Sequence, residues 1–252
     1  MNETTTGALE GKVALVTGAS SGIGAATARA LAREGARIAL SARRADRLET
    51  LARELGEAGT EVFVHVGDLG TREGGQQAID ATVEALGGLD VLINNAGVMF
   101  LGPIDETDPE DWERMIDINL LGLMVASRAA IGPMRARGGG HIVNISSVSG
   151  RFAGPTQGGY NATKWGVNGF SEALRREVNG DGIKVTLIEP GVVATELTDH
   201  IPHAATKERY ESNIAKMEML QSEDIADAIR YVVTRPKRVS INEVLIRPLE
   251  QG

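Results

Sequence analysis

The feature that most constrains the fold is a regular alternation of short apolar runs with longer amphipathic segments. The runs are rich in β-branched residues and nearly continuous in hydrophobicity, which is typical of parallel strands covered on both faces. They lie at 13–17, 37–42, 61–66, 90–94, 141–146, 184–189 and 243–247. Between them, segments such as 24–35 and 45–59 have helical spacing and end at glycine, a common helix stop. The pattern predicts one α/β domain over residues 1–252, with a doubly wound, seven-stranded parallel sheet and helices on both faces.

Length, charge and cysteine content exclude several classes of protein. The 252 residues suit one large domain, and the formal charge of −8 argues against general nucleic-acid binding. The absence of cysteine excludes disulfides, thiolate metal sites and a cysteine nucleophile, and it fits a reducing compartment. The first residues lack the basic start and apolar core of a signal peptide, and no apolar run approaches the ~20 residues of a membrane helix. We therefore expect a cytoplasmic protein without metal, nucleic-acid or membrane partners.

A glycine-rich turn, TGASSGIG, follows the first predicted strand and opens the first predicted helix. Gly18 would allow the tight turn, Gly22 the approach of a pyrophosphate, and Gly24 close packing of helix on strand. The helix N-terminus offers unpaired N–H groups and a partial positive charge to phosphates. The spacing differs from the general G-x-G-x-x-G pattern, and such glycines can be purely structural. Their position after the first strand of an α/β chain nevertheless favours a dinucleotide site.

The end of the second strand indicates which nicotinamide cofactor would bind. Proteins that bind NAD carry an acidic residue there for the ribose 2′-hydroxyl. Here Ala42 is followed by Arg43 and Arg44. Guanidinium groups suit a 2′-phosphate, whereas basic residues fit the alternative of a solvated helix start poorly. We predict NADPH/NADP+ as the cofactor, with Arg43 the preferred ligand of the 2′-phosphate.

Polar residues also follow the third and fourth predicted strands. Asp68 is placed to accept a hydrogen bond from an adenine amino group, although aspartate is common in turns. The segment NNAG at 94–97 combines a turn of small residues with two amides. The cofactor residues predicted in this half of the chain are Gly18, Ser20, Ser21, Gly22, Ile23, Gly24, Arg43, Arg44, Asp68, Leu69, Asn95, Ala96 and Gly97.

The stretch GGYNATKWG places Tyr160 four residues before Lys164, and helical residues at this spacing share a face. A phenol has an ordinary pKa of about 10, and a nearby ammonium lowers that pKa by favouring the phenolate. Such a tyrosine can protonate a carbonyl oxygen or, in reverse, deprotonate an alcohol. Lys164 could also bond the nicotinamide ribose hydroxyls. Alone, the pair is a common exposed pair of helix neighbours, so its interpretation depends on context.

Two further polar positions supply that context. Ser147 follows the fifth strand, thirteen residues before Tyr160, where a hydroxyl can donate to a substrate carbonyl. Spacing alone does not separate it from Ser146 and Ser149. Asn119 lies within a predicted helix, where asparagine is locally unfavourable. It could hold a water beside the lysine, or its side chain could simply bond to the backbone.

The segment 195–222 interrupts the alternation with two histidines, a proline and a mixed helix pattern. We interpret it as a substrate lid over the carboxyl edge of the sheet, the alternative being a surface helical hairpin. The spacing of His200 and His203, with Pro202 between them, is poor for a metal pair. Candidate pocket residues are Phe100, Phe152, Gln157, Leu197, His200 and His203.

Taken together, TGASSGIG, NNAG, Asn119, Ser147 and YNATK resemble the short-chain dehydrogenase/reductase family over nearly the whole chain. The resemblance implies a Rossmann-type sheet of strand order 3-2-1-4-5-6-7 and a catalytic tetrad of Asn119, Ser147, Tyr160 and Lys164, which selects Ser147 over its neighbours. It also implies cofactor contacts beyond the glycine turn, with the Val193 backbone and the Thr195 hydroxyl holding the nicotinamide carboxamide. These contacts are at Tyr160, Lys164, Pro190, Gly191, Val193 and Thr195.

The resemblance extends to activity and assembly. SARRADRL and HIPHAATKERYE are similar to the branch with 3-hydroxy acid dehydrogenases, and most to an NADPH-dependent aldehyde reductase. We predict an NADPH-dependent carbonyl reductase or alcohol dehydrogenase acting on an aldehyde or ketone. A homotetramer, or a dimer, is expected through segments 112–136 and 158–179. One alternative is a non-catalytic NADPH-binding regulator or scaffold, but the tetrad is undamaged. Another is a sugar epimerase or dehydratase, but those relatives usually carry a long C-terminal substrate domain.

Overall fold

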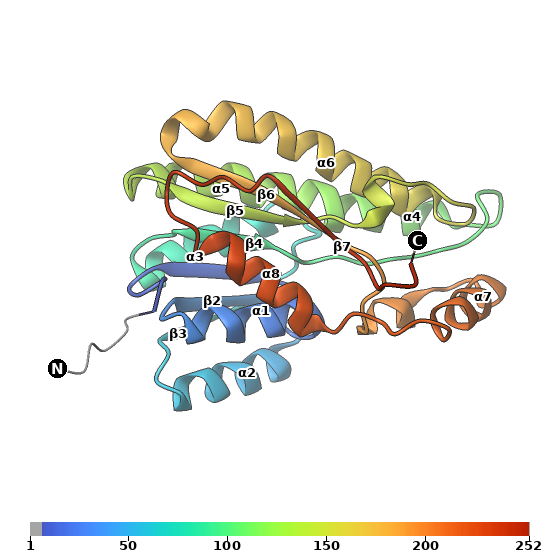
Figure 1. The fold of residues 1–252 in the computed structure, drawn as a ribbon, viewed down its shortest axis with the longest axis horizontal. Coiled ribbons are helices and arrows are strands. Elements are labelled where there is room, and N and C mark those ends of the chain that lie inside the picture. The colour runs from blue at the N-terminus through green and yellow to red at the C-terminus, as the bar shows by residue number, and fades with distance from the viewer. Residues whose placement is uncertain (1–6, 252) are drawn as a thin grey trace.

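The computed structural model describes residues 7–251 and contains one sheet of seven parallel strands (Figure 1). The strand order is β3-β2-β1-β4-β5-β6-β7, which confirms the order that the family resemblance implied. Each strand lies within one residue of its predicted range at either end. The strands are β1 Val13–Thr17, β2 Arg37–Ala42, β3 Val62–Val66, β4 Val91–Asn94, β5 Gly140–Ile145, β6 Ile183–Pro190 and β7 Glu243–Ile246.

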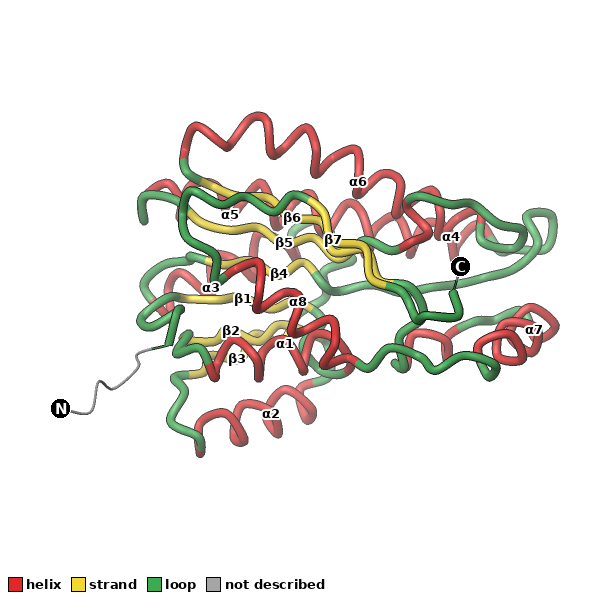
Figure 2. The backbone as a smooth tube through the Cα atoms, viewed as in Figure 1, coloured by secondary structure: helices red, strands yellow, loops and turns green. Residues whose placement is uncertain are grey.

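Helices cover both faces of the sheet (Figure 2). They are α1 Gly22–Arg33, α2 Ala45–Glu57, α3 Gly74–Leu86, α4 Pro109–Met115, α5 Leu123–Ala136, α6 Gly158–Val178, α7 Ala204–Ile214 and α8 Ser222–Val233. One apolar core lies between the sheet and α1, α2 and α8, and a second lies between the sheet and α3, α5 and α6. Within β1, Ala14 and Val16 belong to the first core, and Val13 and Leu15 to the second. The continuous apolar run is therefore buried on both faces, as the sequence predicted.

One helix corrects the expectation that no apolar run approaches membrane length. Pro109–Ala136 is continuous over 28 residues and contains an 18-residue window with a mean hydropathy of 1.4. By length and composition alone it could cross a membrane. Its α5 part packs on the sheet and on α3 and α6, and 44% of the window is buried inside the protein. Core packing accounts for its hydropathy. The expectation about a signal peptide concerns residues 1–6 above all, which lie outside the described residues.

The segment 195–222 lies at the carboxyl edge of the sheet, and Figure 1 shows α7 beyond the ends of the strands. It comprises a 3-10 turn, Glu196–His200, then α7 and an irregular stretch that leads into α8. Backbone hydrogen bonds close its base: Ala194 N donates to Leu220 O at 2.8 Å, and Leu220 N donates to Val192 O at 3.1 Å. A lid needs such an anchored base, and its action on a substrate stays a prediction.

A buried carboxylate anchors the opposite edge of the sheet. Asp90, 5% exposed, immediately precedes β4 and accepts hydrogen bonds from Val13 N at 3.0 Å, Lys12 Nζ at 3.0 Å and Arg137 at 2.7 Å. Burial by itself raises the pKa of Asp90, but the hydrogen bonds from Arg137, Val13 and Lys12 outweigh it, and the net pKa lies below the ordinary 3.8. Asp90 thereby joins the starts of β1 and β4 to the end of α5.

We expect Asp90→Ala to lower the free energy of unfolding by about 2–4 kcal/mol at pH 7, because it leaves a buried N–H and two cations without their acceptor. The Asp90 carboxylate stabilises the folded state fully at pH values above its ordinary pKa of 3.8, and this stabilisation is lost as the pH falls through the lowered pKa of the folded state. The difference in unfolding free energy between wild type and Asp90→Ala should therefore shrink in acid. Urea unfolding at pH 7 and pH 3.5 measures both effects. Exposed Asp105→Ala is the control; a matching loss there would contradict the anchoring role.

Candidate active site

A cavity of about 410 Å³ opens at the carboxyl edge, between the glycine turn and the segment 195–222. Its wall contains every predicted cofactor residue except Gly24, together with Ser147, Tyr160 and Lys164. Gly24 lies in α1, and Asn119 lies behind the wall. Parallel strand pairing therefore gathers residues from distant parts of the chain into one site.

The glycine turn leaves space that side chains would fill. Gly18 and Gly22 have φ values of +64° and +53°, a backbone conformation that favours glycine. A Cβ atom on Gly24 would lie 2.4 Å from the Gly18 carbonyl oxygen, so α1 packs against the turn more closely than alanine would permit. The Ser21 side chain does not cap α1, which leaves the first N–H groups of that helix available. This arrangement fits an anion such as a pyrophosphate.

The two amides of NNAG hold the wall of the cavity. Asn95 Nδ2 donates to the carbonyl oxygens of Thr17 at 2.9 Å and Gly18 at 3.2 Å, which fixes the glycine turn. Asn94 Nδ2 donates to Asn144 Oδ1 at 2.8 Å and joins β4 to β5. Both asparagines of the NNAG segment therefore have structural roles, since their amides hydrogen-bond to other parts of the protein.

Both predicted ligands of a 2′-phosphate line the cavity. The side chain of Arg43 is 56% exposed, and its nearest carboxylate oxygen, on Asp68, lies 3.9 Å away. Arg44 instead reaches across to the glycine turn, where it donates to Ser20 Oγ at 2.9 Å and Ser21 Oγ at 2.6 Å. Of the two guanidinium groups, that of Arg44 is the one fixed against the turn.

Tyr160, Lys164 and Ser147 come together in the cavity. Tyr160 and Lys164 project from α6 and are only 7% and 6% exposed, and Lys164 Nζ lies 5.6 Å from the centroid of the Tyr160 ring. The Lys164 ammonium donates to Ile145 O at the end of β5, at 2.9 Å. Ser147 Oγ accepts a hydrogen bond from Ser149 N at 3.0 Å and donates to Pro190 O at 3.5 Å, and it is near enough to the Tyr160 phenol to lower the pKa of that phenol.

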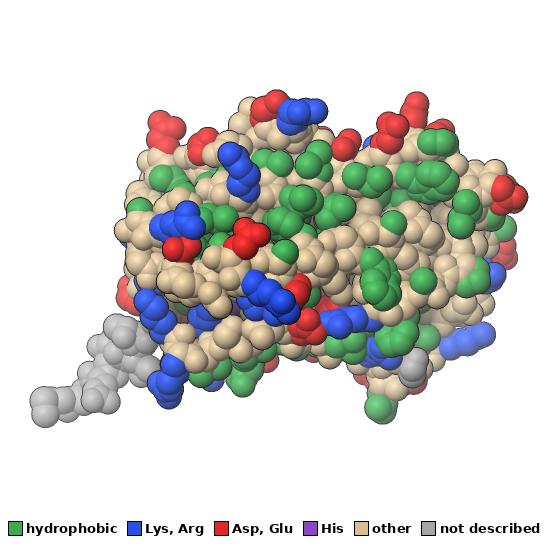
Figure 3. Space-filling model, turned by 90° about the horizontal axis from the view of Figure 1, so that it is seen from above, with side chains coloured by type: hydrophobic (Ala, Val, Ile, Leu, Met, Phe, Trp, Pro, Cys, Tyr) green, Lys and Arg blue, Asp and Glu red, His purple; other side chains and the backbone are tan. Residues whose placement is uncertain are grey.

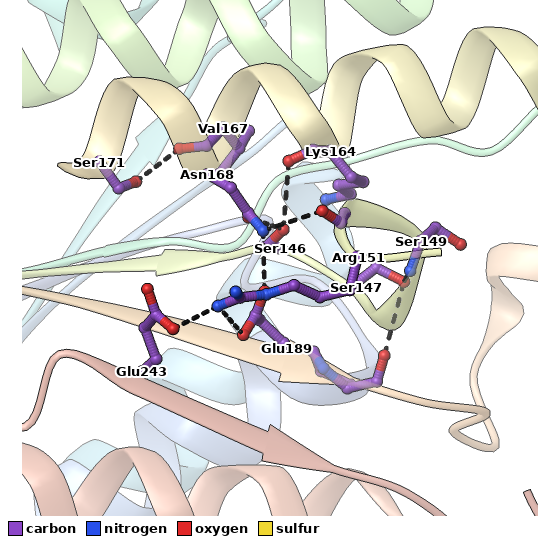
Figure 4. Close-up of polar contacts among 12 residues, drawn as sticks. Ser146, Ser147, Ser149, Arg151, Lys164, Val167, Asn168, Ser171, Glu189 and Glu243 are labelled. Carbon is purple, nitrogen blue, oxygen red and sulfur yellow. Dashed lines mark hydrogen bonds and ion pairs between the residues drawn. The ribbon is translucent and has the colours of Figure 1, made fainter. Parts of the chain in front are cut away.

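The structure separates Ser147 from its neighbour Ser146. The Ser146 hydroxyl donates instead to Asn168 Oδ1 on α6, at 2.5 Å (Figure 4). The Ser149 contact with Ser147 runs through its backbone N–H. Of the three serines, Ser147 is the one whose hydroxyl engages Tyr160.

The pKa of Tyr160 corrects the sequence argument. Burial raises the pKa of the phenol above its ordinary value of 10, the hydrogen bond with Ser147 lowers it, and the neighbouring phenol of Tyr210 raises it. The net change is upward because burial is the largest of these effects. Burial lowers the pKa of Lys164 from 10.5 to about 8. The protein itself therefore keeps the phenol protonated beside a lysine that titrates near physiological pH.

Asn119 lies in a π-helical turn, Ile116–Gly122, between α4 and α5. Its side-chain amide donates to Val98 O and accepts from Val98 N, each at 2.8 Å, and it is 1% exposed. The side chain thus follows the backbone-bonding alternative that the sequence left open. The π-helical turn was not predicted; such turns are frequent at functional sites.

Three of the six candidate pocket residues, Gln157, Leu197 and His200, line the cavity, and the other three were wrong. Phe100 is buried in an apolar cluster with Met115. Phe152 is 60% exposed and lies on the surface, outside the cavity wall. His203 Nδ1 accepts from Thr206 N at 3.1 Å and so caps α7.

Tyr210 and Gln251 are among the residues that line the cavity without having been predicted from the sequence. Tyr210 projects from α7 and packs in the apolar cluster that contains Tyr160. The only sequence signal for Tyr210 is the weak apolar periodicity of the α7 segment. Gln251 reaches the cavity from the C-terminal segment, where its Oε1 accepts from Val192 N at 3.0 Å. No local pattern signals this contact between segments distant in the sequence.

An ion pair with a buried carboxylate lies beside the loop that follows β5, residues 146–151, which we call the serine loop (Figure 4). Glu189, 1% exposed, directly precedes Pro190 and accepts from Arg151 Nε at 2.7 Å and from Asn168 Nδ2 at 2.8 Å. Arg151 also pairs with Glu243 on β7. The network joins the serine loop, α6 and the end of β6, and so fixes the three segments that carry Ser147, Lys164 and Pro190.

The chain matches a family model described as short chain dehydrogenase over residues 12–206. It is 42% identical over 245 residues to glycine betaine reductase ATRR of Emericella nidulans, a match that covers 97% of this chain but 19% of that longer protein. It is 36% identical over 243 residues to an uncharacterised oxidoreductase of Staphylococcus saprophyticus, which covers 96% of this chain and 97% of the relative.

Solved structures share the fold over almost their whole length. An alcohol dehydrogenase from the archaeon Thermococcus sibiricus, complexed with 5-hydroxy-NADP, has a TM-score of 0.85 and 34% identity, covering 96% of this chain and 98% of the other. The closed form of a serine dehydrogenase complexed with NADP+ has a TM-score of 0.87 and 33% identity, covering 95% and 96%.

We expect Lys164→Met to raise the free energy of unfolding at pH 7 by about 1–2 kcal/mol. A pKa lowered from 10.5 to about 8 means that burial of the ammonium destabilises the folded state by roughly 3 kcal/mol, and methionine removes this cost. The gain is smaller than about 3 kcal/mol because the variant also loses the hydrogen bond to Ile145. The unfolded lysine keeps its proton up to about pH 10.5, so the gain should fade as the pH rises from 8 towards 10. Urea unfolding at pH 7, 8.5 and 10 tests this, with exposed Lys216→Met as the control.

Proposed function

The chain belongs to the short-chain dehydrogenase family, and on this premise we propose that it is an NADPH-dependent carbonyl reductase or alcohol dehydrogenase. The observation that supports this most is the meeting of Tyr160, Ser147 and Lys164 in the same cavity as the glycine turn. Two solved structures of the same fold are complexed with NADP+ or an NADP derivative. The cofactor would supply a hydride to a carbonyl carbon.

The cavity wall offers residues for each part of NADPH, from the 2′-phosphate to the nicotinamide. The open α1 N-terminus and the glycine turn would hold the pyrophosphate, and the two arginines the 2′-phosphate. Lys164 would hold the nicotinamide ribose, and the backbone at Val193 with the Thr195 hydroxyl the carboxamide. The residues proposed to bind are Gly18, Ser20, Ser21, Gly22, Ile23, Gly24, Arg43, Arg44, Asp68, Leu69, Asn95, Ala96, Gly97, Tyr160, Lys164, Pro190, Gly191, Val193 and Thr195.

In this proposal Tyr160 is the acid in the reducing direction. Its O–H gives a proton to the carbonyl oxygen while the carbon accepts hydride, so the C=O double bond becomes a C–O single bond with new C–H and O–H bonds. The raised pKa keeps the phenol protonated and ready to donate. Ser147 donates a hydrogen bond to the same oxygen, and the Lys164 ammonium stabilises the phenolate that remains. Asn119, the fourth member of the proposed tetrad, would act indirectly, because its amide holds the backbone of Val98 in the cavity wall.

The substrate class follows from the resemblance of the lid and of the second strand end. We propose that the resemblance of SARRADRL and HIPHAATKERYE relates the chain to clavulanic acid dehydrogenase, which reduces clavulaldehyde with NADPH. Serine, which names one of the structural neighbours, is itself a 3-hydroxy acid. We therefore propose a small polar aldehyde or ketone, such as a clavulaldehyde-like biosynthetic aldehyde, enclosed by the lid at 195–222.

We also propose a homotetramer, or a dimer, that works in the cytoplasm. Apolar side chains remain exposed on the helices expected to associate, including Leu121 at 40% and Trp165 at 52%. Figure 3 shows hydrophobic side chains gathered among charged ones on the face seen from above. The absence of cysteine fits a reducing compartment.

Tyr160→Phe should lower turnover by about 10² to 10⁴-fold, because it removes the proton donor and leaves the ring in place. Binding of NADPH, followed by its fluorescence, should stay within twofold of wild type. NADPH oxidation across a panel of aldehydes and ketones measures turnover, and exposed Tyr231→Phe is the matched control. A variant with wild-type turnover refutes this role. Tight NADPH binding without oxidation by the wild type would favour a non-catalytic regulator.

The wild-type protein should have a higher kcat/KM with NADPH than with NADH. Replacing Arg43 and Arg44 together by alanine should reduce that preference by about tenfold or more, because charge-assisted hydrogen bonds to the 2′-phosphate are lost. Steady-state kinetics with both cofactors measures the ratio, and Arg53→Ala, on the exposed face of α2, is the control. An NADH value equal to or above that of NADPH contradicts the cofactor assignment.

A further inference from the structure

The segment 195–222 brings an acidic side chain, Glu196, to the arginine end of the cavity. Glu196 Oε2 accepts from Arg44 at 2.8 Å, and Oε1 accepts from Arg47 at 2.6 Å. Hydrogen bonds from Arg47 and Arg44 lower the pKa of this carboxyl to about 2. Glu196 is therefore an anion at neutral pH, lodged between two guanidinium groups.

The charges at this end of the cavity nearly compensate one another. Three guanidinium groups, on Arg43, Arg44 and Arg47, face the carboxylates of Asp68 and Glu196. One positive charge remains for an incoming anion. The side chains are 40–56% exposed, so solvent weakens each pair and leaves the ion pairs exchangeable.

The Glu196 contact also lies next to the glycine turn. Arg44 donates to Ser20 and Ser21 of that turn while it pairs with Glu196. Thr195, the residue before Glu196, has its Cγ2 atom 3.2 Å from the position a Cβ atom would take on Gly22. The start of the lid segment is thus packed against the glycine turn. The Glu196 carboxylate is hydrogen-bonded to Arg44, the guanidinium that also contacts this turn.

We propose that Glu196 is an internal competitor of the 2′-phosphate and sets how strongly the chain prefers NADPH over NADH. A phosphate that binds Arg44 must displace this carboxylate or share the guanidinium with it, and in either case the neighbouring negative charge weakens the attraction. Glu196 is a specificity-determining residue and takes no part in hydride or proton transfer. The inference rests on the proposed binding of NADPH.

Calorimetric titration with two nucleotides isolates this effect from catalysis. Adenosine 2′,5′-bisphosphate carries the 2′-phosphate, and adenosine 5′-monophosphate lacks it. Glu196→Gln keeps the shape of the side chain and removes its charge. It should tighten binding of the bisphosphate about threefold to fivefold, and leave binding of the monophosphate within error.

Two variants control for other causes. Glu49→Gln, on an exposed position of α2, changes the net charge equally without contacting Arg44, and should leave both affinities unchanged. In an Arg44→Ala background, Glu196→Gln should gain less than it does in the wild type, because the guanidinium for which the two anions compete is gone. Raising the salt concentration should shrink the gain in the wild-type background.

An unchanged ratio of the two affinities in Glu196→Gln overturns the proposal. Weaker binding of the bisphosphate also overturns it, since Glu196 would then be orienting Arg44 for the phosphate. The proposed NADPH preference is tested separately by the wild type. If wild-type protein binds both nucleotides equally, that preference fails, while the effect of Glu196→Gln still decides the role of Glu196. Binding of neither nucleotide by either protein contradicts both proposals.

Discussion

Parallel pairing of the strands is the constraint on which the rest of the structure depends. A parallel strand can be reached only through a crossover, so each strand must be followed by a connection that returns along a face of the sheet. All carboxyl ends then lie at one edge. The turns after β1, β2 and β3, the NNAG segment after β4 and the serine loop after β5 meet there, although Gly18 and Ser147 are far apart in the sequence. The opposite edge, where Asp90 ties three elements together, carries stability.

The features predicted correctly from sequence are those encoded over a few neighbouring residues. Strand ranges follow from continuous apolar runs, because burial on both faces demands them. Features that depend on contacts between distant segments were missed or wrong. Gln251 and Glu196 reach the cavity only through the path of the folded chain, and Phe152 turns outward although it follows the serine loop closely. Whether such a residue lines the cavity or lies on the surface depends on tertiary packing, which local sequence patterns do not predict.

The polar groups at the site illustrate the same division. Residue type and spacing were sufficient to place Tyr160 and Lys164 on one face of α6, because the helical repeat fixes that relation. Their protonation behaviour was not predictable in this way. It depends on desolvation and on the hydrogen bond to Ile145, and these are properties of the completed fold. The network of Glu189, Arg151 and Asn168 supports three segments of the site, and no local sequence pattern predicts it, because its members come from distant parts of the chain.

Burial of the site has opposite consequences for its two ionisable partners, and the difference bears on direction. Desolvation disfavours the charged form of each group, so the phenol of Tyr160 stays protonated while the ammonium of Lys164 becomes easier to deprotonate. A protonated phenol is the form required to donate to a carbonyl oxygen, whereas removal of an alcohol proton requires the phenolate. The protonated phenol therefore matches the role of acid that the proposed carbonyl reduction assigns to Tyr160. Oxidation would require a higher pH, or additional positive charge held close to the phenol.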